Sequence, residues 1–318
     1  MATKSWRLII ALTALIAVGL SACDHGRQEP ITIAINDWTG YQPLLLARQL
    51  GYLDNDLVHL ATLGSTTESL QKFRAGVVDA ATVTLDEALL LKAEGFDIAV
   101  VLIMDISNGA DAIIAKPGIH SLAELKGKTI GVENTALGAY VLARALDQAH
   151  LTVTDITTTP ITAAEQLSAF KNSAIDAVVS FEPLKSQLLE QGGHVVFDST
   201  MIPDEIVDVL VVRRSVLEQD QDRIAQVIHA WFRTLDYIHN NRDETLHWLS
   251  QQQQIVEASA AKAMDEIVFP GQEKNRSLLK KNGPTQQTLD QLSQIMLAKK
   301  LISNKPDTET LLTDRFVK

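Results

Sequence analysis

Cysteine, catalytic signatures and metal-ligand patterns are scarce or missing in this sequence. Its 318 residues include one cysteine, Cys23, so no disulfide can form within the chain and the fold must depend on its hydrophobic cores. The spacings typical of a nucleophile elbow, a zinc protease, a phosphate-binding loop and an EF-hand are absent, and the eight histidines are scattered. These absences count against an enzyme, a metal site and a bound cofactor.

Positive charge is also scarce. The chain has 28 lysines and arginines against 39 aspartates and glutamates, a net charge of −11. Removal of residues 1–22, which hold two cations and no acids, would take this charge to −13. Such a balance disfavours binding to nucleic acid or to an anionic membrane surface through bulk electrostatics. We therefore expect no nucleic-acid partner.

Long apolar runs are missing except at residues 8–20. Lys4 and Arg7 precede this run, and small residues follow it, which is the pattern of an export signal. Thirteen helical residues would reach only ~20 Å, too short for a bilayer core of ~30 Å. We therefore predict a signal peptide over residues 1–22 rather than a permanent transmembrane helix.

The segment after this run, Leu20-Ser21-Ala22-Cys23, resembles the lipobox of bacterial lipoproteins. The resemblance implies that the signal is cut before Cys23 and that lipid on Cys23 anchors the protein in a membrane. Asp24 resembles the residue that retains enterobacterial lipoproteins in the inner membrane, so we expect a periplasmic protein anchored there. The polar residues 23–30 are typical of a short tether.

An internal repeat organises the rest of the chain. The sequence ESLQKFRAGVVD at residues 68–79 returns as EQLSAFKNSAID at residues 165–176, an offset of 97. The similarity extends over about residues 31–95 and 128–192. Two copies of this length are too few and too long for a solenoid or a propeller, so each copy has the size of a lobe.

Apolar strand patterns alternate with helical patterns up to about residue 212, which predicts an α/β fold with mostly parallel sheets covered by helices. From about residue 221 the pattern becomes helical. Ile224, Ile228 and Trp231 recur at the spacing of one helix face, and we expect Trp231 to lie in the core. This helical region is expected to cover the first lobe.

Candidate binding residues follow the predicted strands, because α/β sheets bind ligands beyond the carboxyl ends of their strands. Trp38 and Tyr41 lie on a loop and suit stacking on a flat solute. The hydroxyl residues could instead serve as helix N-caps, and the acids could serve helix dipoles. The candidates from these positions are Asp37, Trp38, Tyr41, Ser65, Thr66, Thr84, Asp86, Asn134, Thr135, Glu182 and Asp208.

Four segments resemble the substrate-binding proteins of nitrate, sulfonate and taurine ABC importers, a superfamily that also includes binders and one synthase of the thiamine pyrimidine. They are residues 37–53, 78–91, 121–132 and 178–183.

The resemblance implies a type II periplasmic binding protein fold with two Rossmann-like lobes joined by two crossover strands. Lobe 1 would comprise residues 31–110 and 213–318, and lobe 2 residues 111–212. ADAIIA at 110–115 and IVDVLVV at 206–212 fit the crossovers, which places Asn108 to Asp111 and Asp208 near the hinge. Asn108 is therefore a further candidate binding residue.

The function that follows is capture of a small solute by lobe closure and its delivery to an ABC permease in the inner membrane, by a monomer. A thiamine-pyrimidine synthase-like enzyme and a ligand-sensing module of a signalling system remain alternatives. The paired acids could also suggest a glycosidase, which nothing else supports. The candidate positions contain acids but no arginine or lysine, so we expect a solute with a donor such as an amine, of aminosulfonate or aminopyrimidine type.

Overall fold

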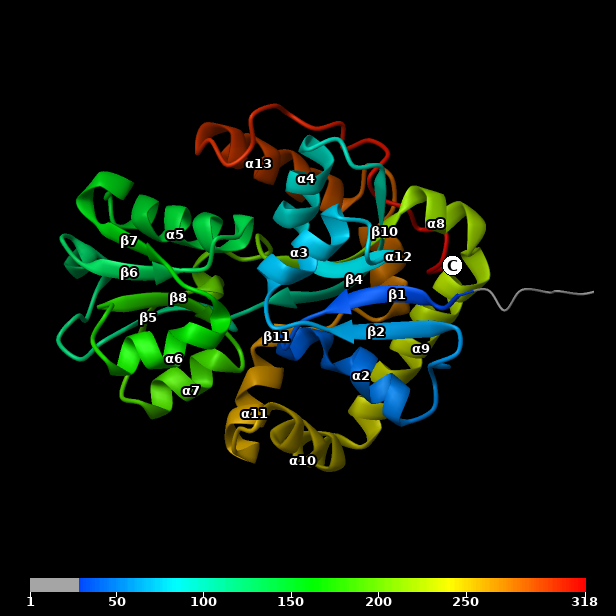
Figure 1. Ribbon diagram of the computed structural model, residues 1–318, viewed down its shortest axis with the longest axis horizontal. Coiled ribbons are helices and arrows are strands. Elements are labelled where there is room, and N and C mark those ends of the chain that lie inside the picture. The colour runs from blue at the N-terminus through cyan, green and yellow to red at the C-terminus, as the bar shows by residue number, and fades with distance from the viewer. Residues whose placement is uncertain (1–28) are drawn as a thin grey trace, which may run out of the picture. The chain divides into compact units, whose positions relative to one another are not determined.

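Two β-sheets form the framework of residues 29–318, the part of the chain that the computed structural model describes (Figure 1). In these residues the first sheet has the strand order β11-β4-β10-β3-β1-β2 and the second β7-β6-β8-β5-β9. The strands of the first sheet are β1 (Ile31–Ile35), β2 (Val58–Thr62), β3 (Ala80–Thr84), β4 (Ile98–Ser107), β10 (Val207–Arg213) and β11 (Ile267–Val268). Those of the second are β5 (Asp111–Ala115), β6 (Thr129–Val132), β7 (Thr157–Pro160), β8 (Ala177–Phe181) and β9 (His194–Asp198). The signal peptide, Cys23, Asp24 and most of the predicted tether lie outside the described residues.

The repeat is visible in the pairing of the strands. Ile33 pairs with Ala80 in the first sheet, and Ile130 pairs with Ala177 in the second, so both partners are 97 residues apart. The repeated aspartate has the same role in each copy. The carboxylate of Asp79 accepts from the backbone N–H of Thr32, and that of Asp176 accepts from Thr129, both at 2.8 Å. These two acids hold adjacent strands together and are structural.

The prediction of mostly parallel sheets is wrong in one respect. β1 pairs in parallel with β2 and β3, and β6 with β7 and β8, but β10 and β5 are antiparallel to both of their neighbours. The physical reason is the connection between the sheets. The chain enters each sheet from the other one through β5 or β10, so these strands run antiparallel to the strands beside them. The short strand β11 is also antiparallel to its neighbour β4.

Helices cover both faces of each sheet (Figure 1). In the first lobe α2 packs against α9 on one face, and α4 packs against α13 on the other. In the second lobe α5 covers one face, and α6 and α7 cover the other. Short 3-10 turns, including η1 (Thr39–Tyr41) and η4 (Ser199–Met201), connect some elements. The helices are α2 (Gln42–Gln49), α3 (Thr66–Arg74), α4 (Leu85–Ala93), α5 (Ala136–Gln148), α6 (Ala163–Lys171), α7 (Leu184–Glu190), α8 (Arg214–Gln219), α9 (Gln221–Asn240), α10 (Arg242–Gln253), α11 (Glu257–Asp265), α12 (Gln272–Leu278) and α13 (Pro284–Ala298).

The helical region after residue 221 packs mainly on the first lobe, and Trp231 is fully buried, as expected. The region also contains the two-residue strand β11, which pairs with the edge of β4 and which the sequence analysis missed. No helix between residues 29 and 318 has both the length and the hydrophobicity that crossing a bilayer requires.

The chain passes between the sheets twice, at residues 108–110 and at residues 202–206. The segments that the sequence analysis assigned to the crossovers are instead β5 and β10, the strands that follow each passage. β10 lies in the first sheet, so the lobe boundary predicted at residue 212 falls at about residue 206 by sheet membership.

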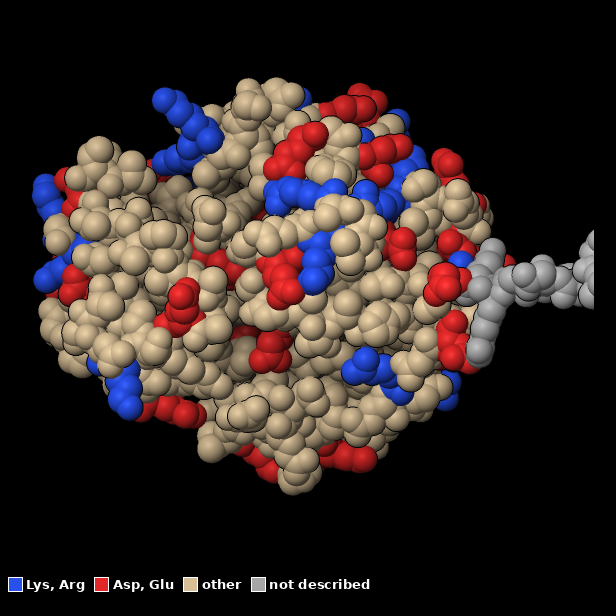
Figure 2. Space-filling model, viewed as in Figure 1, with Lys and Arg blue, Asp and Glu red and all other residues tan. Residues whose placement is uncertain are grey.

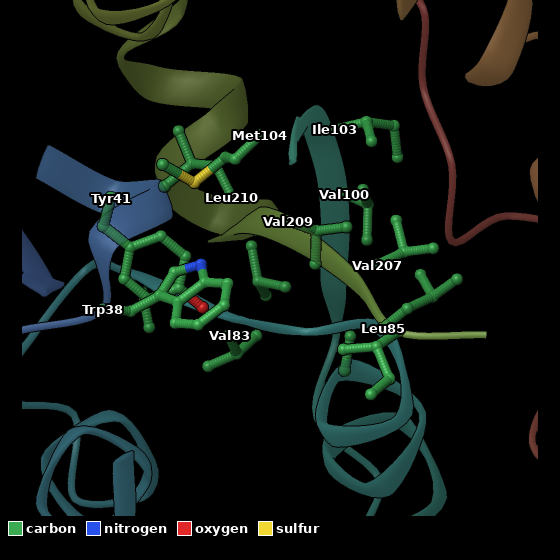
Figure 3. Close-up of a cluster of buried hydrophobic side chains, with 14 of the residues drawn as sticks. Trp38, Tyr41, Val83, Leu85, Val100, Ile103, Met104, Val207, Val209 and Leu210 are labelled. Atoms are coloured by element: carbon green, nitrogen blue, oxygen red, sulfur yellow. The ribbon is translucent and has the colours of Figure 1, made fainter. Parts of the chain in front are cut away.

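A hydrophobic core fills the first lobe and reaches the junction with the second. Figure 3 shows Trp38 and Tyr41 beside each other at one end of this core, next to Val83 and Leu210. Both aromatic residues are buried. The core therefore fixes one wall of the region where the lobes meet.

Candidate functional site

A small cavity lies between the two lobes at the carboxyl ends of β1 and β3. It offers about 20 Å³ to the centre of a water molecule, enough for about one water. We call it the inner cavity, and both lobes contribute residues to its lining. Its residues are Asn36, Trp38, Tyr41, Thr66, Thr84, Glu87, Asp111, Leu137, Phe181 and Asp208.

Trp38 and Tyr41 hold two buried carboxyl groups, Asp208, which lines the cavity, and Asp105, which does not. The indole Nε1 of Trp38 donates to both carboxyl oxygens of Asp105, at 3.2 and 3.3 Å, and the Tyr41 hydroxyl donates to Asp208. Trp38 also meets Phe181 of the second lobe edge to face, with ring centroids 6.0 Å apart. The two aromatic residues thus have positions in the site and also structural partners.

Gly40 is required by this arrangement. A Cβ at this position would lie 2.1 Å from Oδ2 of Asp105 and 2.2 Å from Nε1 of Trp38. We expect Gly40→Ala to lower the free energy of unfolding by about 1–3 kcal/mol, because the buried side chains must move. Denaturant unfolding measures this, with Gly64→Ala as the control, since its added Cβ has its nearest neighbour at 3.7 Å. Equal stability of the two variants would contradict this packing.

The duplication brings Asp111 and Asp208 to the same cavity. Asp111 pairs with Phe181 across β5 and β8, and Asp208 pairs with Thr84 across β10 and β3. Each partner in one pair is 97 residues from its counterpart in the other. The antiparallel strands are therefore also part of the repeat, and they deliver one aspartate from each lobe.

Two buried carboxyl oxygens on the cavity have no hydrogen-bond partner. They are Oδ2 of Asp111 and Oε1 of Glu87, from residues 3% and 1% exposed. The other oxygen of Glu87 accepts from the backbone N–H of Thr84 at 3.1 Å, which fixes the side chain. Because buried acceptors are nearly always satisfied, these oxygens indicate where a donor from a solute would bind.

Burial raises the pKa values of the carboxyl groups at the site, so it favours their neutral, protonated forms. Desolvation is the main cause throughout. It raises the pKa of Asp105 to about 8 and that of Asp111 to about 7, and in both cases nearby carboxylates add to the effect. The pKa values of Asp208 and Glu87 are raised well above their usual range, for Asp208 by desolvation and then by Asp105. These groups resist ionisation because burial disfavours their charged forms, and no cation lines the inner cavity to offset that cost.

Stability is therefore expected to fall as pH rises from about 5 to about 8. A carboxyl with a raised pKa binds more protons in the folded state than in the unfolded state over this window, so the slope of unfolding free energy with pH is negative. Exposed carboxylates whose pKa is lowered titrate below the window. Chemical denaturation should show a shallower decline for Asp105→Asn, which cannot ionise. A wild-type protein that gains stability over this range would contradict the assignment.

An outer groove of about 160 Å³ adjoins the inner cavity and shares Asn36 and Phe181 with it. Ser65 lies on this groove and caps α3 by accepting from the backbone N–H of Glu68 at 3.2 Å. Asp37 lines the same groove, and its carboxylate accepts from Gln42 at 3.2 Å. Figure 2 shows acidic side chains on this face along the line where the lobes meet.

Seven of the predicted residues thus lie on the inner cavity or the outer groove: Asp37, Trp38, Tyr41, Ser65, Thr66, Thr84 and Asp208. Asp86 is buried directly beside Glu87 but lines neither space. Burial raises the pKa of Asp86 to about 6, and its Oδ2 has no partner.

Glu182 does not reach the cavity. Its carboxylate accepts from the backbone N–H and hydroxyl of Ser186 and lies 3.8 Å from the ammonium of Lys185. Lys185 in turn donates to the carbonyl of Gly109 at 2.8 Å and pairs with Glu266 of the first lobe. Glu182 therefore belongs to a buried ion network at the passage between the lobes.

Asn108, Asn134 and Thr135 lie elsewhere. Asn108 is exposed, and its backbone N–H donates to the backbone carbonyl of Glu266 at 2.8 Å. Thr135 caps α5 by accepting from Gly138 at 3.0 Å, the alternative that the sequence left open for it. Asn134 and Thr135 line a different pocket.

That pocket is the larger one, at about 550 Å³ by the same measure, and it lies between α5 and the end of α13. Figure 2 shows this hollow with basic side chains at its rim. Its walls are mainly apolar, and Lys299 on its rim pairs with Asp147 at 2.5 Å. We prefer the inner cavity as the candidate site because only there do fully buried carboxyl oxygens lack partners among the described lining residues.

Sequence reasoning missed Asp105 and Asp111, and it left Glu87 to a helix-dipole role. Asp111 could have been found, because it precedes Asp208 by the repeat offset of 97. Asp105 lies inside an apolar strand pattern, where its contact with Trp38 has no local signal. Between residues 29 and 318 no group of three or more histidine, cysteine or acidic side chains is arranged to hold a metal ion.

Two lobes with mixed sheets, joined by two passages around a buried cavity, define a type II periplasmic binding protein fold, which confirms the predicted fold class. Residues 24–250 match the NMT1-like family, so the chain belongs to this family.

Individual relatives agree with this assignment. An Escherichia coli K12 protein named for binding aliphatic sulfonates is 29% identical over 198 residues, which are 60% of this chain and 62% of that protein. The alkanesulfonate-binding protein SsuA from Xanthomonas axonopodis pv. citri bound to MOPS has a TM-score of 0.74 at 17% identity, covering 87% of this chain and 96% of its own. The desulfurization enzyme DSZB shares the fold, with a TM-score of 0.67 at 15% identity over 91% and 98% of the chains. The chain thus spans about three fifths of its E. coli relative's length.

Proposed function

We propose that this protein is an extracytoplasmic solute-binding protein that captures a small organic solute between its lobes and delivers it to an ABC importer. The observation that carries the proposal is the pair of unpartnered buried oxygens of Asp111 and Glu87. They come from different lobes, and a solute that donates to both would hold the lobes together. The E. coli relative and the SsuA structure support the binding role.

The chemistry of the lining favours a solute with a hydrogen-bond donor such as an amine. No arginine, lysine or histidine lines the inner cavity, so a bare anion such as nitrate would meet only carboxyl groups and hydroxyls. The chemistry of a zwitterionic aminosulfonate or an aminopyrimidine suits the site better, because the inner cavity has room for a group of about the size of an amine beside Asp111, and the rest of the solute would lie in the adjoining outer groove. The outer groove offers Ser65 and backbone groups to a second polar part of the solute.

Contacts across the cleft indicate how the lobes close. Thr67 at the start of α3 donates to Glu133 of the second lobe through both its backbone N–H and its hydroxyl, at 3.3 and 2.9 Å. These bonds lie beside the cavity and can form only when the lobes meet. We propose that they favour the closed form that a permease recognises.

Binding is proposed rather than catalysis. The inner cavity has no serine, cysteine or histidine in its lining to act as an activated nucleophile. Its polar groups are instead acids that accept hydrogen bonds. The relation to DSZB concerns the fold alone.

A thermal-shift panel tests the binding proposal. A solute at about 100 times its dissociation constant adds ~2.7 kcal/mol to the unfolding free energy, a shift of a few degrees for a chain of this size. We expect amine-bearing aminosulfonates or aminopyrimidines to raise the melting temperature of the wild type. If none of a broad panel of amines, sulfonates and pyrimidines does so, the solute-binding proposal fails.

We also propose that lipid on Cys23 anchors the protein, in the inner membrane if Asp24 acts as it does in enterobacteria. Cys23→Ser should remove the acylation site and release the protein or leave its signal uncut. Membrane fractionation followed by mass measurement of the amino terminus checks this. A serine variant that stays in the membrane fraction with a processed amino terminus would contradict the anchor.

A further inference from the structure

Three carboxyl groups line the inner cavity, those of Glu87, Asp111 and Asp208, and a fourth, Asp105, is buried beside Asp208 without lining the cavity itself. Asp105 and Asp208 stand directly opposite each other on the antiparallel strands β4 and β10. Directly opposed residues of such a pair have Cβ atoms only ~5 Å apart, and like charges there repel. Trp38 donates to one of these acids and Tyr41 to the other, but a neutral donor does not cancel a charge.

Glu87 and Asp111 approach the same space from α4 and β5. We call Glu87, Asp105, Asp111 and Asp208 the carboxyl cluster; all four are at least 97% buried. Ionisation of all four would put four negative charges into one desolvated volume. The cluster must therefore hold protons whenever no positive charge accompanies it.

The charged groups around the cluster do not supply that positive charge. Lys185 acts on Asp111 and lowers its pKa, but it is already paired with Glu266 and lies beside Glu182, and the net shift of the Asp111 pKa is upward. Arg144 pairs with Glu205, which also accepts from Tyr140. The other titratable groups that act on the cluster are acids and a phenol: Tyr41 from η1, Asp86 from α4, Glu133 after β6 and Glu182 after β8.

We propose that the solute presents a cationic group, such as an ammonium or an amidinium, to the carboxyl cluster and that its binding releases a proton from the cluster to the solvent. This inference rests on the proposed function. It adds to that function the positive charge on the solute and the release of a proton when the solute binds. In the exchange, a protonated carboxyl of the cluster loses its proton to water, and the carboxylate that remains pairs with the N–H donors of the bound cation. The unpartnered oxygens of Asp111 and Glu87 are the acceptors that this cation reaches.

The raised pKa values of Asp105 and Asp111, about 8 and about 7, support the exchange because they place it near neutral pH. Proton release then couples affinity to pH. If one proton leaves for each cation bound, the dissociation constant falls by about tenfold for each unit rise in pH across the titration. A neutral solute with the same shape would show no such dependence.

Calorimetry with matched probes tests the inference. Acetamidinium and benzamidinium stay protonated through neutral pH, and acetamide and benzamide are their neutral counterparts. We expect the amidinium ions to bind more tightly than the amides to the wild-type protein, and their dissociation constants to fall between about pH 6 and about pH 8. Titration in two buffers of different ionisation enthalpy should show about one proton released for each amidinium bound.

Two variants sharpen the test. Asp105→Asn removes one member of the opposed pair, so it should reduce the proton release and flatten the pH dependence. Asp236→Asn changes an exposed carboxylate on α9 and should leave both unchanged. Amides that bind as tightly as amidinium ions, or amidinium binding without proton release, would overturn the inference, as would no amidinium binding at all. An aminosulfonate or pyrimidine that binds without proton release would overturn it while leaving the proposed function intact.

Discussion

Lys185→Met is expected to lower the free energy of unfolding by about 3–5 kcal/mol, because it leaves a buried charge without its partner. Lys185 is 1% exposed and extends from α7 in the second lobe to Glu266 in the first, with Glu182 3.8 Å from its ammonium group. Methionine keeps most of the length of the side chain but lacks the terminal ammonium group and its charge. The expected loss is large because Glu182 is fully buried and cannot be rescued by water.

Lys262→Met is the matched control. Lys262 also lies 3.8 Å from the carboxylate of Glu266, but its side chain is 53% exposed. A surface pair of this kind contributes only about 0–1 kcal/mol. Denaturant unfolding of both variants should therefore separate them clearly. If Lys185→Met is as stable as the control, the buried ion network does not hold the lobes together.

Asp111→Asn and Glu87→Gln are expected to weaken solute binding by about 1.5–3 kcal/mol each, a factor of roughly 10 to 150, the scale of a hydrogen bond to a charged group. Both substitutions keep the size of the side chain. Neither Asp111 nor Glu87 forms a salt bridge that the substitution would break. The free energy of unfolding without solute should therefore stay the same or rise near neutral pH. The amide removes the cost of ionising a buried acid.

Titration calorimetry with a hit from the thermal-shift panel measures this effect, and Asp236→Asn serves as the exposed control. The structure changes an expectation here. The sequence pointed to Glu182 as a binding acid, but Glu182→Gln should act mainly on stability through Lys185. A strong binding loss in Glu182→Gln with unchanged stability would reverse that reassignment.

Much of the fold follows from patterns that are local in the sequence. The 97-residue repeat predicts two equivalent lobes, and the alternating apolar runs place most strands and helices within a few residues. The direction of β5 and β10 could not be read in this way. An apolar strand has the same pattern whether it runs parallel or antiparallel to its neighbours, and only the passage between the lobes decides it.

The site was predictable where a polar residue ends a strand. Trp38, Tyr41 and Thr84 reached the inner cavity for that reason. Asp208 lies at the start of β10 and reaches it because that strand runs antiparallel to β3, which places Asp208 opposite Thr84. Asp105 was not predictable, because its position depends on β4 and β10 lying side by side and on Gly40 leaving room for the carboxyl group. Asn134 and Thr135 were predicted from the same position after a strand. In the structure Thr135 is the N-cap of α5, and both residues line the other pocket.

Recognition of a donor on the solute by carboxyl groups in the inner cavity is tested most directly by calorimetric titration of the wild type and Asp111→Asn. The two solutes should differ only in an amine, as taurine and ethanesulfonate do. We expect the amine-bearing solute to bind more tightly to the wild type and to lose that advantage in Asp111→Asn. Tight binding of ethanesulfonate that equals or exceeds that of taurine, and that Asp111→Asn leaves unchanged, would contradict this expectation.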